Sequence, residues 1–204
     1  LNESQDFNPL TEDLPLEPGI SRWQGQFSII SAANFTTLFT PPHPLWISRS
    51  GKLEYGMNPD GTRDISTFNA NPSVGSGESY EILASISTAP VQELRDSDTN
   101  YPTWISERYL QLPNDITPRT RALAEQITLG LETPYDKVQA VTKYLRENIQ
   151  YTPVLEEGPP SGQEPIDWFL FEAKTGFCNY YSTAEIILLR SLGIPARWAV
   201  GYAQ

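Results

Sequence analysis

The stretch from Thr175 to Tyr202 constrains the fold most, because it holds the only cysteine of the chain, Cys178, at the start of a helical pattern. Thr175 and Gly176 interrupt the pattern that precedes it. Apolar and aromatic residues then recur at the spacing of one helical face: Phe177, Tyr181, Ala184, Leu188 and Leu192. The spacing predicts a helix with Cys178 in its first turn.

The end of this helix is also marked in the sequence. Gly193 can take the left-handed position that follows a helix, and Pro195 cannot continue one. We predict that the helix ends at Leu192 and that Ala196 to Tyr202 forms a strand.

A cysteine at a helix start can act as a nucleophile. Unpaired N–H groups and the helix dipole favour the thiolate, and the same N–H groups can bind the oxyanion of an acyl-transfer intermediate. Gly176 is expected to let a substrate carbonyl approach the backbone. The alternative is that Cys178 is a small buried hydrophobe, and helix position alone favours this alternative.

The motif GFCNYYSTAEIILLRSLGIPARWAVGY resembles the core of the transglutaminase-like superfamily. The resemblance implies that Cys178 is the catalytic nucleophile. The order of elements before it extends the resemblance to residues 104–204, and is similar to bacterial proteins whose domain lies outside the cytoplasm, attached to a multi-span membrane protein. For residues 1–100 the resemblance is weak.

The chemistry that this resemblance implies is papain-like. A thiolate attacks a carboxamide, and a histidine oriented by an aspartate moves the protons. In the family both partners follow the cysteine, whereas no histidine follows Cys178. We therefore expect a truncated domain whose histidine and aspartate lie beyond Gln204. Alone, it should be inactive, should expose the last strand as an edge, and should fold less well than an extended chain.

Charge and cysteine content exclude several classes of function. The chain has 204 residues and a net charge of −11, which argues against nucleic acid or an anionic membrane surface as partner. One cysteine excludes an internal disulfide and a cysteine-rich zinc site. The sequence indicates no metal and no cofactor. It contains no apolar run of the ~20 residues that a membrane span needs, and its first residues lack methionine and a signal peptide. We expect a soluble, excised piece.

The predicted fold class is α+β: a small β-rich domain followed by the helical first half of a papain- or transglutaminase-like cysteine core. Residues 1–20 are expected to be an extended, poorly ordered acidic lead-in, residues 21–100 a β-rich sandwich or partial barrel, and residues 101–204 the partial transglutaminase-like domain. Ser50-Gly51 and Asn58 to Gly61 are turn signals in the β-rich part, and residues 71–77 are expected to be loop.

Two helices are predicted from paired Thr-Pro signals. Thr117 and Thr133 are expected to cap them, with proline at the first helical position and Asp136 completing the second cap. Residues 104–112 are predicted to be a short helix, residues 94–103 a polar linker and residues 156–165 an acidic loop.

Several other residues near the motif have a functional and a structural interpretation. Asn179 and Tyr180 can line a cleft or pack in the core. Arg190 and Arg197 are expected to bind backbone or carboxylates, Asp167 to cap a helix, and Trp168 and Trp198 to be buried rather than to flank an acyl site. The single histidine, His43, lies between prolines and is expected to be an exposed loop residue.

Two functions remain open from the sequence. The first is an extracytoplasmic fragment of a cysteine acyl-transfer enzyme, periplasmic or at the cell surface, that acts on a protein or peptide through a glutamine side chain or another amide. Whether it transfers to an amine or to water depends on which enters the cleft. The second is a non-catalytic interaction or scaffold module of a membrane-associated protein.

Overall fold

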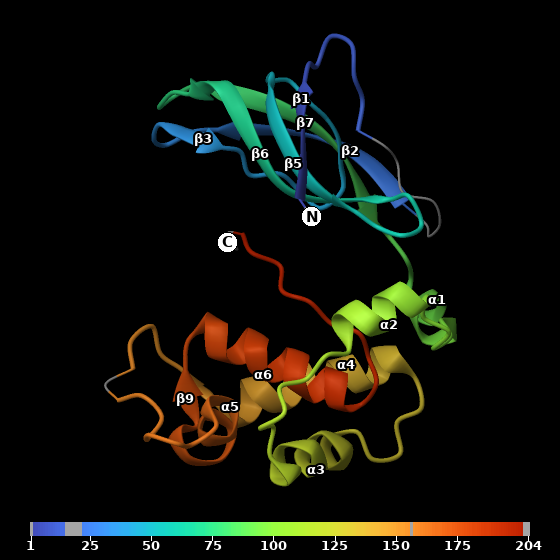
Figure 1. The fold of residues 1–204 in the computed structure, drawn as a ribbon, viewed down its shortest axis with the longest axis vertical. Coiled ribbons are helices and arrows are strands. Elements are labelled where there is room, and N and C mark those ends of the chain that lie inside the picture. The colour runs from blue at the N-terminus through green and yellow to red at the C-terminus, as the bar shows by residue number, and fades with distance from the viewer. Residues whose placement is uncertain (1, 15–21, 156, 202–204) are drawn as a thin grey trace. The chain divides into compact units, whose positions relative to one another are not determined.

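The chain is of the α+β class, as predicted. The computed structural model describes residues 2–14, 22–155 and 157–201. The chain forms two compact units, Leu1–Pro90 and Val91–Gln204. Figure 1 shows the sheets of the first unit and the helices of the second.

The first unit is a sandwich of two antiparallel sheets, with strand orders β1-β5-β6-β3 and β2-β7-β4. Its strands are β1 Asn2–Phe7, β2 Arg22–Ile30, β3 Phe35–Thr37, β4 Pro44–Ile47, β5 Gly51–Met57, β6 Arg63–Val74 and β7 Ser79–Ser87. Both sheets contribute to one buried cluster, for example Leu53 and Phe68 from the first sheet and Ile47 and Ile82 from the second. Alternation along the strands places these side chains on the inner faces.

The structure corrects three expectations for this unit. Asn2–Phe7 is not poorly ordered, because it pairs along its length with β5; residue 1 and residues 15–20 of the expected lead-in lie outside the described residues. The signal at Ser50-Gly51 does not form a hairpin, because β4 and β5 belong to different sheets. The expected loop at 71–77 begins later, since β6 continues to Val74, which pairs with Phe35 of β3.

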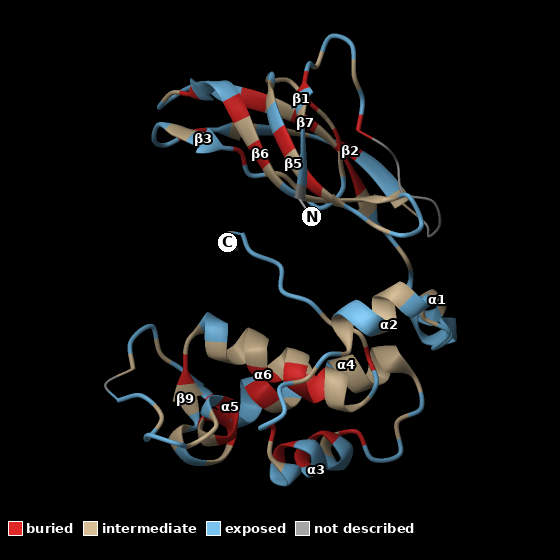
Figure 2. Ribbon diagram, in the orientation of Figure 1, coloured by how far each residue is buried: buried red, intermediate tan, exposed pale blue. Residues whose placement is uncertain are grey.

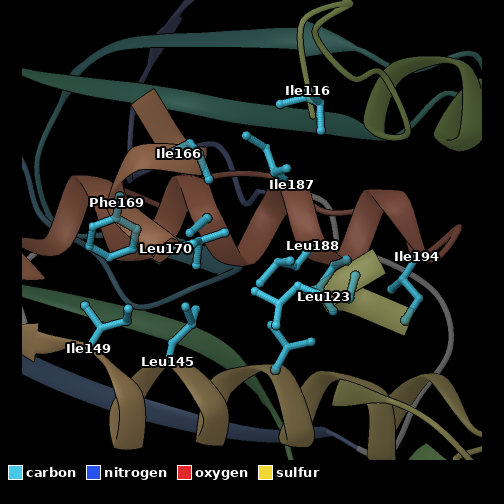
Figure 3. Packing of buried hydrophobic residues seen from close by; sticks show 14 residues of the cluster. Ile116, Leu123, Leu145, Ile149, Ile166, Phe169, Leu170, Ile187, Leu188 and Ile194 are labelled. Atoms are coloured by element: carbon cyan, nitrogen blue, oxygen red, sulfur yellow. The ribbon is translucent and has the colours of Figure 1, made fainter. Parts of the chain in front are cut away.

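The second unit is helical around a central helix, α6. Its elements are α1 Val91–Asp96, α2 Thr103–Tyr109, α3 Pro118–Ile127, α4 Pro134–Asn148, β8 Gln150–Tyr151, α5 Pro165–Trp168, the π-helix η1 Phe169–Ala173, β9 Thr175–Gly176 and α6 Cys178–Ser191. Buried side chains of α3, α4, η1 and α6 meet in one core, including Leu123, Leu145, Leu170 and Leu188, and Figure 3 shows these side chains between the helices.

The two Thr-Pro helix starts are confirmed. The hydroxyl of Thr117 accepts a hydrogen bond from the N–H of Thr120, and that of Thr133 accepts one from the N–H of Asp136. Each cap satisfies one of the N–H groups that a helix start leaves unpaired. The caps therefore fix where α3 and α4 begin.

The segments on either side of the helical core differ from expectation. The expected linker at 94–103 is partly helical, because α1 continues to Asp96. The predicted strand from Ala196 is wrong for the described residues 196–201, which adopt no regular structure; Tyr202 lies outside the described part. Ala196 instead donates its N–H to the carbonyl of Tyr109, at 3.2 Å, and its carbonyl accepts from the guanidinium of Arg190.

Candidate active site

Cys178 is the first residue of α6 and its side chain is exposed. The predicted position at a helix start is therefore confirmed. The thiol lies 3.5 Å from Oδ1 of the neighbouring Asn179, to which it can donate a weak hydrogen bond. The carbonyl of Cys178 accepts from the hydroxyl of Ser182, at 2.8 Å. The sulfur atom therefore faces solvent rather than aliphatic side chains, and the interpretation as a buried hydrophobe does not hold.

The N-terminus of α6 has no side-chain cap, as at α2 and η1 but in contrast to α3, α4 and α5. The helices α3, α4 and α5 are capped by Thr117, Thr133 and Glu164. At α6 the capping position is occupied by Phe177, and no side chain among the described residues bonds to the helix start. The first N–H groups of α6, beside the thiol, are thus free of side-chain acceptors and can bind an anion.

The rest of α6 is anchored in the core. Ala184 and Leu188 are fully buried, and Figure 2 shows α6 exposed at its start and buried along its middle. Gly193 adopts the predicted left-handed conformation, with φ of 75°, and the N–H of Ile194 donates to the carbonyl of Leu189 at 3.0 Å. This is a Schellman-type ending. A helix fixed at its far end and middle holds its first residue in a defined place.

The glycine before the cysteine packs against an aromatic ring. Gly176 is buried, and a Cβ atom added there would lie 2.8 Å from Cε2 of Phe169 and 3.3 Å from Cβ of Tyr180. The direction in which a side chain would point from this glycine therefore faces the protein interior. These contacts give a packing reason for glycine at this position, and the approach of a substrate carbonyl stays a prediction.

An aromatic cluster lies beneath the first turn of α6. The rings of Phe169 and Tyr180 are stacked, with centroids 5.4 Å apart, and Tyr181 meets Phe169 edge-on at 5.5 Å. Phe177 meets Tyr180 edge-on at 5.2 Å. Of the two interpretations of Tyr180, core packing is thus the one that its contacts support, whereas Asn179 is exposed.

The two tryptophans near the motif differ from each other. Trp168 is partly buried and its ring lies 6.3 Å from that of Tyr180. Trp198 is 50% exposed. The expectation of burial is therefore wrong for Trp198, which follows a segment without a neighbouring strand in the described part of the chain.

Arg190 binds backbone carbonyls, as expected, whereas Arg197 lies near an aromatic ring. The guanidinium of Arg190 donates to the carbonyls of Ala196, at 2.6 and 3.0 Å, and of Gln111, at 2.7 Å. Arg190 thereby ties the end of α6 to the segments after it and after α2. The guanidinium of Arg197 lies 6.0 Å from the ring centroid of Tyr109, a cation–π contact.

Asp167 does not cap a helix of its own. Glu164 caps α5, accepting from the N–H groups of Ile166 and Asp167. The carboxylate of Asp167 is almost fully buried and forms an ion pair with Arg119, while accepting from the hydroxyl of Thr117. The hydrogen bonds from Arg119 lower the pKa of Asp167, against the opposing effect of burial. This carboxylate therefore joins α5 to the start of α3.

No base for Cys178 is found among the described residues of the second unit. Residues 91–201 contain no histidine. His43 lies in the first unit, in an exposed loop, with φ of 54°, and its carbonyl accepts from the N–H of Ser85 at 2.9 Å. The described residues of the second unit therefore provide an exposed thiol at a helix start and no histidine beside it.

The described residues also lack a metal-binding cluster and a membrane-spanning helix. No group of three or more His, Cys, Asp or Glu side chains there could hold a metal ion. Within those same ranges, no helix is both long and apolar enough to cross a membrane.

Sequence reasoning missed the residues that support the site. Glu164 could have been found, because Glu164-Pro165 has the same form of an acceptor before a proline as the two Thr-Pro caps. Arg119 carried no such signal, because its partner Asp167 lies 48 residues away in the sequence. Phe169 carried none either, because the π-helix η1 separates it from its partner Gly176.

Comparison with known proteins finds a family model that matches part of the second unit, and relatives of the chain. A model of the transglutaminase-like superfamily matches residues 121–204. An uncharacterized protein, YebA, of Bacillus subtilis is 44% identical over 100 residues, covering 48% of this chain and 14% of that protein. A protein-glutamine gamma-glutamyltransferase of Pseudomonas aeruginosa is 38% identical over 113 residues, covering 54% of this chain and 16% of the enzyme. The aligned parts are thus a small share of both relatives.

A solved structure shares the fold over more of the chain. The periplasmic domain of TgpA from Pseudomonas aeruginosa matches with a TM-score of 0.54 and 20% identity, over 88% of this chain and 56% of that domain. At this identity the likeness shows the fold alone.

Proposed function

Residues 121–204 belong to the transglutaminase-like superfamily, and from this premise we propose that Cys178 is the nucleophile of a cysteine acyl-transfer site. The observation that carries the proposal is the exposed thiol at the uncapped start of α6. A thiol at that position is accessible to a substrate and lies beside the first N–H groups of the helix, which can bind the oxyanion of an acyl-transfer intermediate.

The proposed reaction proceeds through a thioester. The thiolate of Cys178 attacks the carbonyl carbon of a carboxamide, and N–H groups at the start of α6 that have no side-chain acceptor stabilise the negative charge on its oxygen. The C–N bond breaks, and the amine leaves with a proton from the acid form of the base. A second amine or water then attacks the thioester and regenerates the thiolate.

We propose that the general base for Cys178 lies outside residues 91–201. Those residues contain no histidine, whereas the reaction needs a proton acceptor and donor. The alignments cover only 14% and 16% of the two relatives, so these proteins have ample chain outside the shared segment. We expect the histidine and its orienting aspartate to be contributed by such a segment.

A protein glutamine side chain is the proposed acyl donor. The support is the name of the Pseudomonas relative, a protein-glutamine gamma-glutamyltransferase, at 38% identity. An extracytoplasmic location in a membrane-anchored parent protein is proposed from the fold shared with a periplasmic domain. The net charge of −11 argues against nucleic acid as a partner.

The first test measures the reactivity of Cys178 in the folded chain. Iodoacetamide is added at pH 6, where an ordinary thiol is almost entirely protonated. We expect alkylation about tenfold faster in the native chain than in the chain unfolded in guanidinium. The Cys178→Ser variant, which must show no labelling, is the control.

The second test uses the full-length parent protein. Transfer of a glutamine peptide to a primary amine is measured for wild type and for Cys178→Ser, and we expect the substitution to abolish it. If native and unfolded chains are alkylated at the same rate and Cys178→Ser retains wild-type transfer, the chain is instead the non-catalytic module.

A further inference from the structure

Gly176 occupies a site where only glycine fits, for a reason of space rather than backbone conformation. A Cβ atom there would lie 2.8 Å from Cε2 and 3.1 Å from Cδ2 of Phe169, and 3.3 Å from Cβ of Tyr180. Real Cβ atoms almost never approach carbon so closely, and interiors packed at crystal density resist such an insertion. The backbone of β9 therefore lies directly against the Phe169 ring.

The same ring supports the chain on the other side of Cys178. Phe169 is fully buried, is stacked on Tyr180 with an interplanar angle of 28°, and meets Tyr181 at 69°. Tyr180 and Tyr181 follow the cysteine in the first turn of α6. One rigid side chain thus contacts Gly176, two residues before Cys178, and also Tyr180 and Tyr181, two and three residues after it. Figure 3 shows this side chain at the end of α6 opposite Ile194.

Backbone hydrogen bonds hold both sides of this contact. Phe169 begins the π-helix η1, and its carbonyl accepts from the N–H of Lys174 at 3.1 Å. Gly176 is held by β8: its carbonyl accepts from the N–H of Thr152 at 2.9 Å, and the carbonyl of Lys174 accepts from the N–H of Gln150 at 2.8 Å. A clash at this contact therefore has to be relieved by the first turn of α6.

We infer that Phe169 and Gly176 are positioning residues for Cys178: the fit of the Phe169 ring against a residue without a side chain sets where the first turn of α6 lies and hence where the thiol points. Neither residue touches a substrate. The inference rests on the proposed function in one respect, that the group being positioned is the nucleophile.

The experiment compares Cys178 alkylation by iodoacetamide in the folded chain for wild type and Gly176→Ala. We expect the second-order rate constant of Gly176→Ala to fall by about tenfold, because displacements of about 1 Å have large effects on reacting groups. Gly158→Ala is the matched control, since nothing lies within 4 Å of a Cβ atom at Gly158. It is expected to react at the wild-type rate. Thermal melting of each variant verifies that folded protein is compared.

A second substitution separates positioning from simple loss of stability. Phe169→Leu removes the ring atoms that a Cβ atom at position 176 would strike. In the double variant Phe169→Leu, Gly176→Ala, we expect the rate constant to return to within about twofold of that of Phe169→Leu alone, as coupled contacting residues do. A double variant as slow as Gly176→Ala contradicts the inference, as does a Gly176→Ala protein with wild-type reactivity.

The inference can still be tested when Gly176→Ala does not fold. The decisive comparison is then Phe169→Leu against the double variant: equal folding and reactivity support the inference, and a double variant that also fails to fold overturns it. Failure of the proposed function is seen elsewhere, as equal alkylation of native and unfolded wild type, and the two results are therefore distinguishable.

Discussion

At the scale of single residues, Tyr80 holds a loop of the first unit through one buried hydroxyl. Its side chain is 1% exposed. The hydroxyl donates to the carbonyl of Phe39 at 2.8 Å and accepts from the N–H of the same residue at 3.1 Å. Burial raises the pKa of Tyr80, against the hydrogen bond to Phe39. The neutral phenol therefore satisfies both backbone groups after β3.

Tyr80→Phe should destabilise the first unit. The substitution keeps the ring but leaves the two backbone groups of Phe39 without their partner, at a cost of about 1–2 kcal/mol. Urea denaturation followed by tryptophan fluorescence measures the change. An unaltered free energy of unfolding would show that water or a shifted loop replaces the hydroxyl.

At the scale of elements, a buried carboxylate joins α3 to α5. Asp167 is paired with Arg119, whose Nε donates at 2.7 Å, and it accepts from the cap residue Thr117. Arg119 also binds the exposed Glu172 at 2.9 Å and lies over the ring of Phe171 at 4.5 Å. The pair therefore determines how α5 and η1 are placed against the core.

Asp167→Asn should reduce the free energy of unfolding at pH 7 and make that free energy less dependent on pH in the acidic range. At pH 7 the loss of charge-assisted hydrogen bonds is expected to cost about 2 kcal/mol. The pKa of Asp167 is lowered in the folded chain by Arg119, so its stabilisation is complete above about pH 4, the ordinary range of aspartate, and is lost as the pH falls towards the folded value. Urea unfolding between pH 2 and pH 7 measures both effects.

Glu172→Gln is the control for this prediction. It removes the other carboxylate that binds Arg119, but Glu172 has 48% of its side chain exposed. Exposed ion pairs contribute only about 0–1 kcal/mol, and we expect a small loss. A loss as large as that of Asp167→Asn would mean that burial of the pair is not what matters.

The elements that sequence could predict are those with local signals. The Thr-Pro caps of α3 and α4, the Gly193 ending and the position of Cys178 depend on residues next to each other. The π-helix η1 and the left-handed Lys174, with φ of 48°, have no such signal, since they arise where α5 must turn into β9. Apolar residues after Ala196 predicted a strand, but strand propensity needs a neighbouring strand to be realised.

In the candidate site, too, only features with a local sequence signal could be predicted. The position of Cys178 at a helix start could be predicted, because the motif around it is contiguous in the sequence. Its support could not, because the contact of Phe169 with Gly176 and the pairing of Arg119 with Asp167 depend on tertiary packing. A glycine required for space also looks the same in a sequence as one required for conformation or for a ligand.

At the scale of the whole molecule, each unit has its own buried cluster. Ile82 and Leu53 belong to the cluster of the first unit, and Leu188 and Leu145 to that of the second. Because the two clusters share no residue, the loss of packing in one is expected to be felt mainly within it.

Ile82→Ala should destabilise the first unit without altering Cys178. Ile82 is fully buried, and truncating such a side chain costs about 3 kcal/mol. Hydrogen exchange is expected to accelerate in β7 and its neighbours, while the rate of Cys178 alkylation stays at the wild-type value. The mirror variant Leu188→Ala, in the middle of α6, should have the opposite pattern. A fall in Cys178 reactivity caused by Ile82→Ala would instead reveal energetic coupling between the units.

The π-helix before the cysteine has a consequence for changes in chain length. The number of residues between Asp167 and Cys178 is constrained at three points. The ion pair with Arg119 fixes Asp167, and the hydrogen bond from the N–H of Lys174 to the carbonyl of Phe169 fixes the turn. Pairing of β9 with β8 then fixes the segment that leads into α6. One amino acid inserted or deleted there would rotate the thiol to another side of the helix. The exposed loop at 157–162 has no such constraint, and it is the place to graft a reporter peptide or an affinity tag.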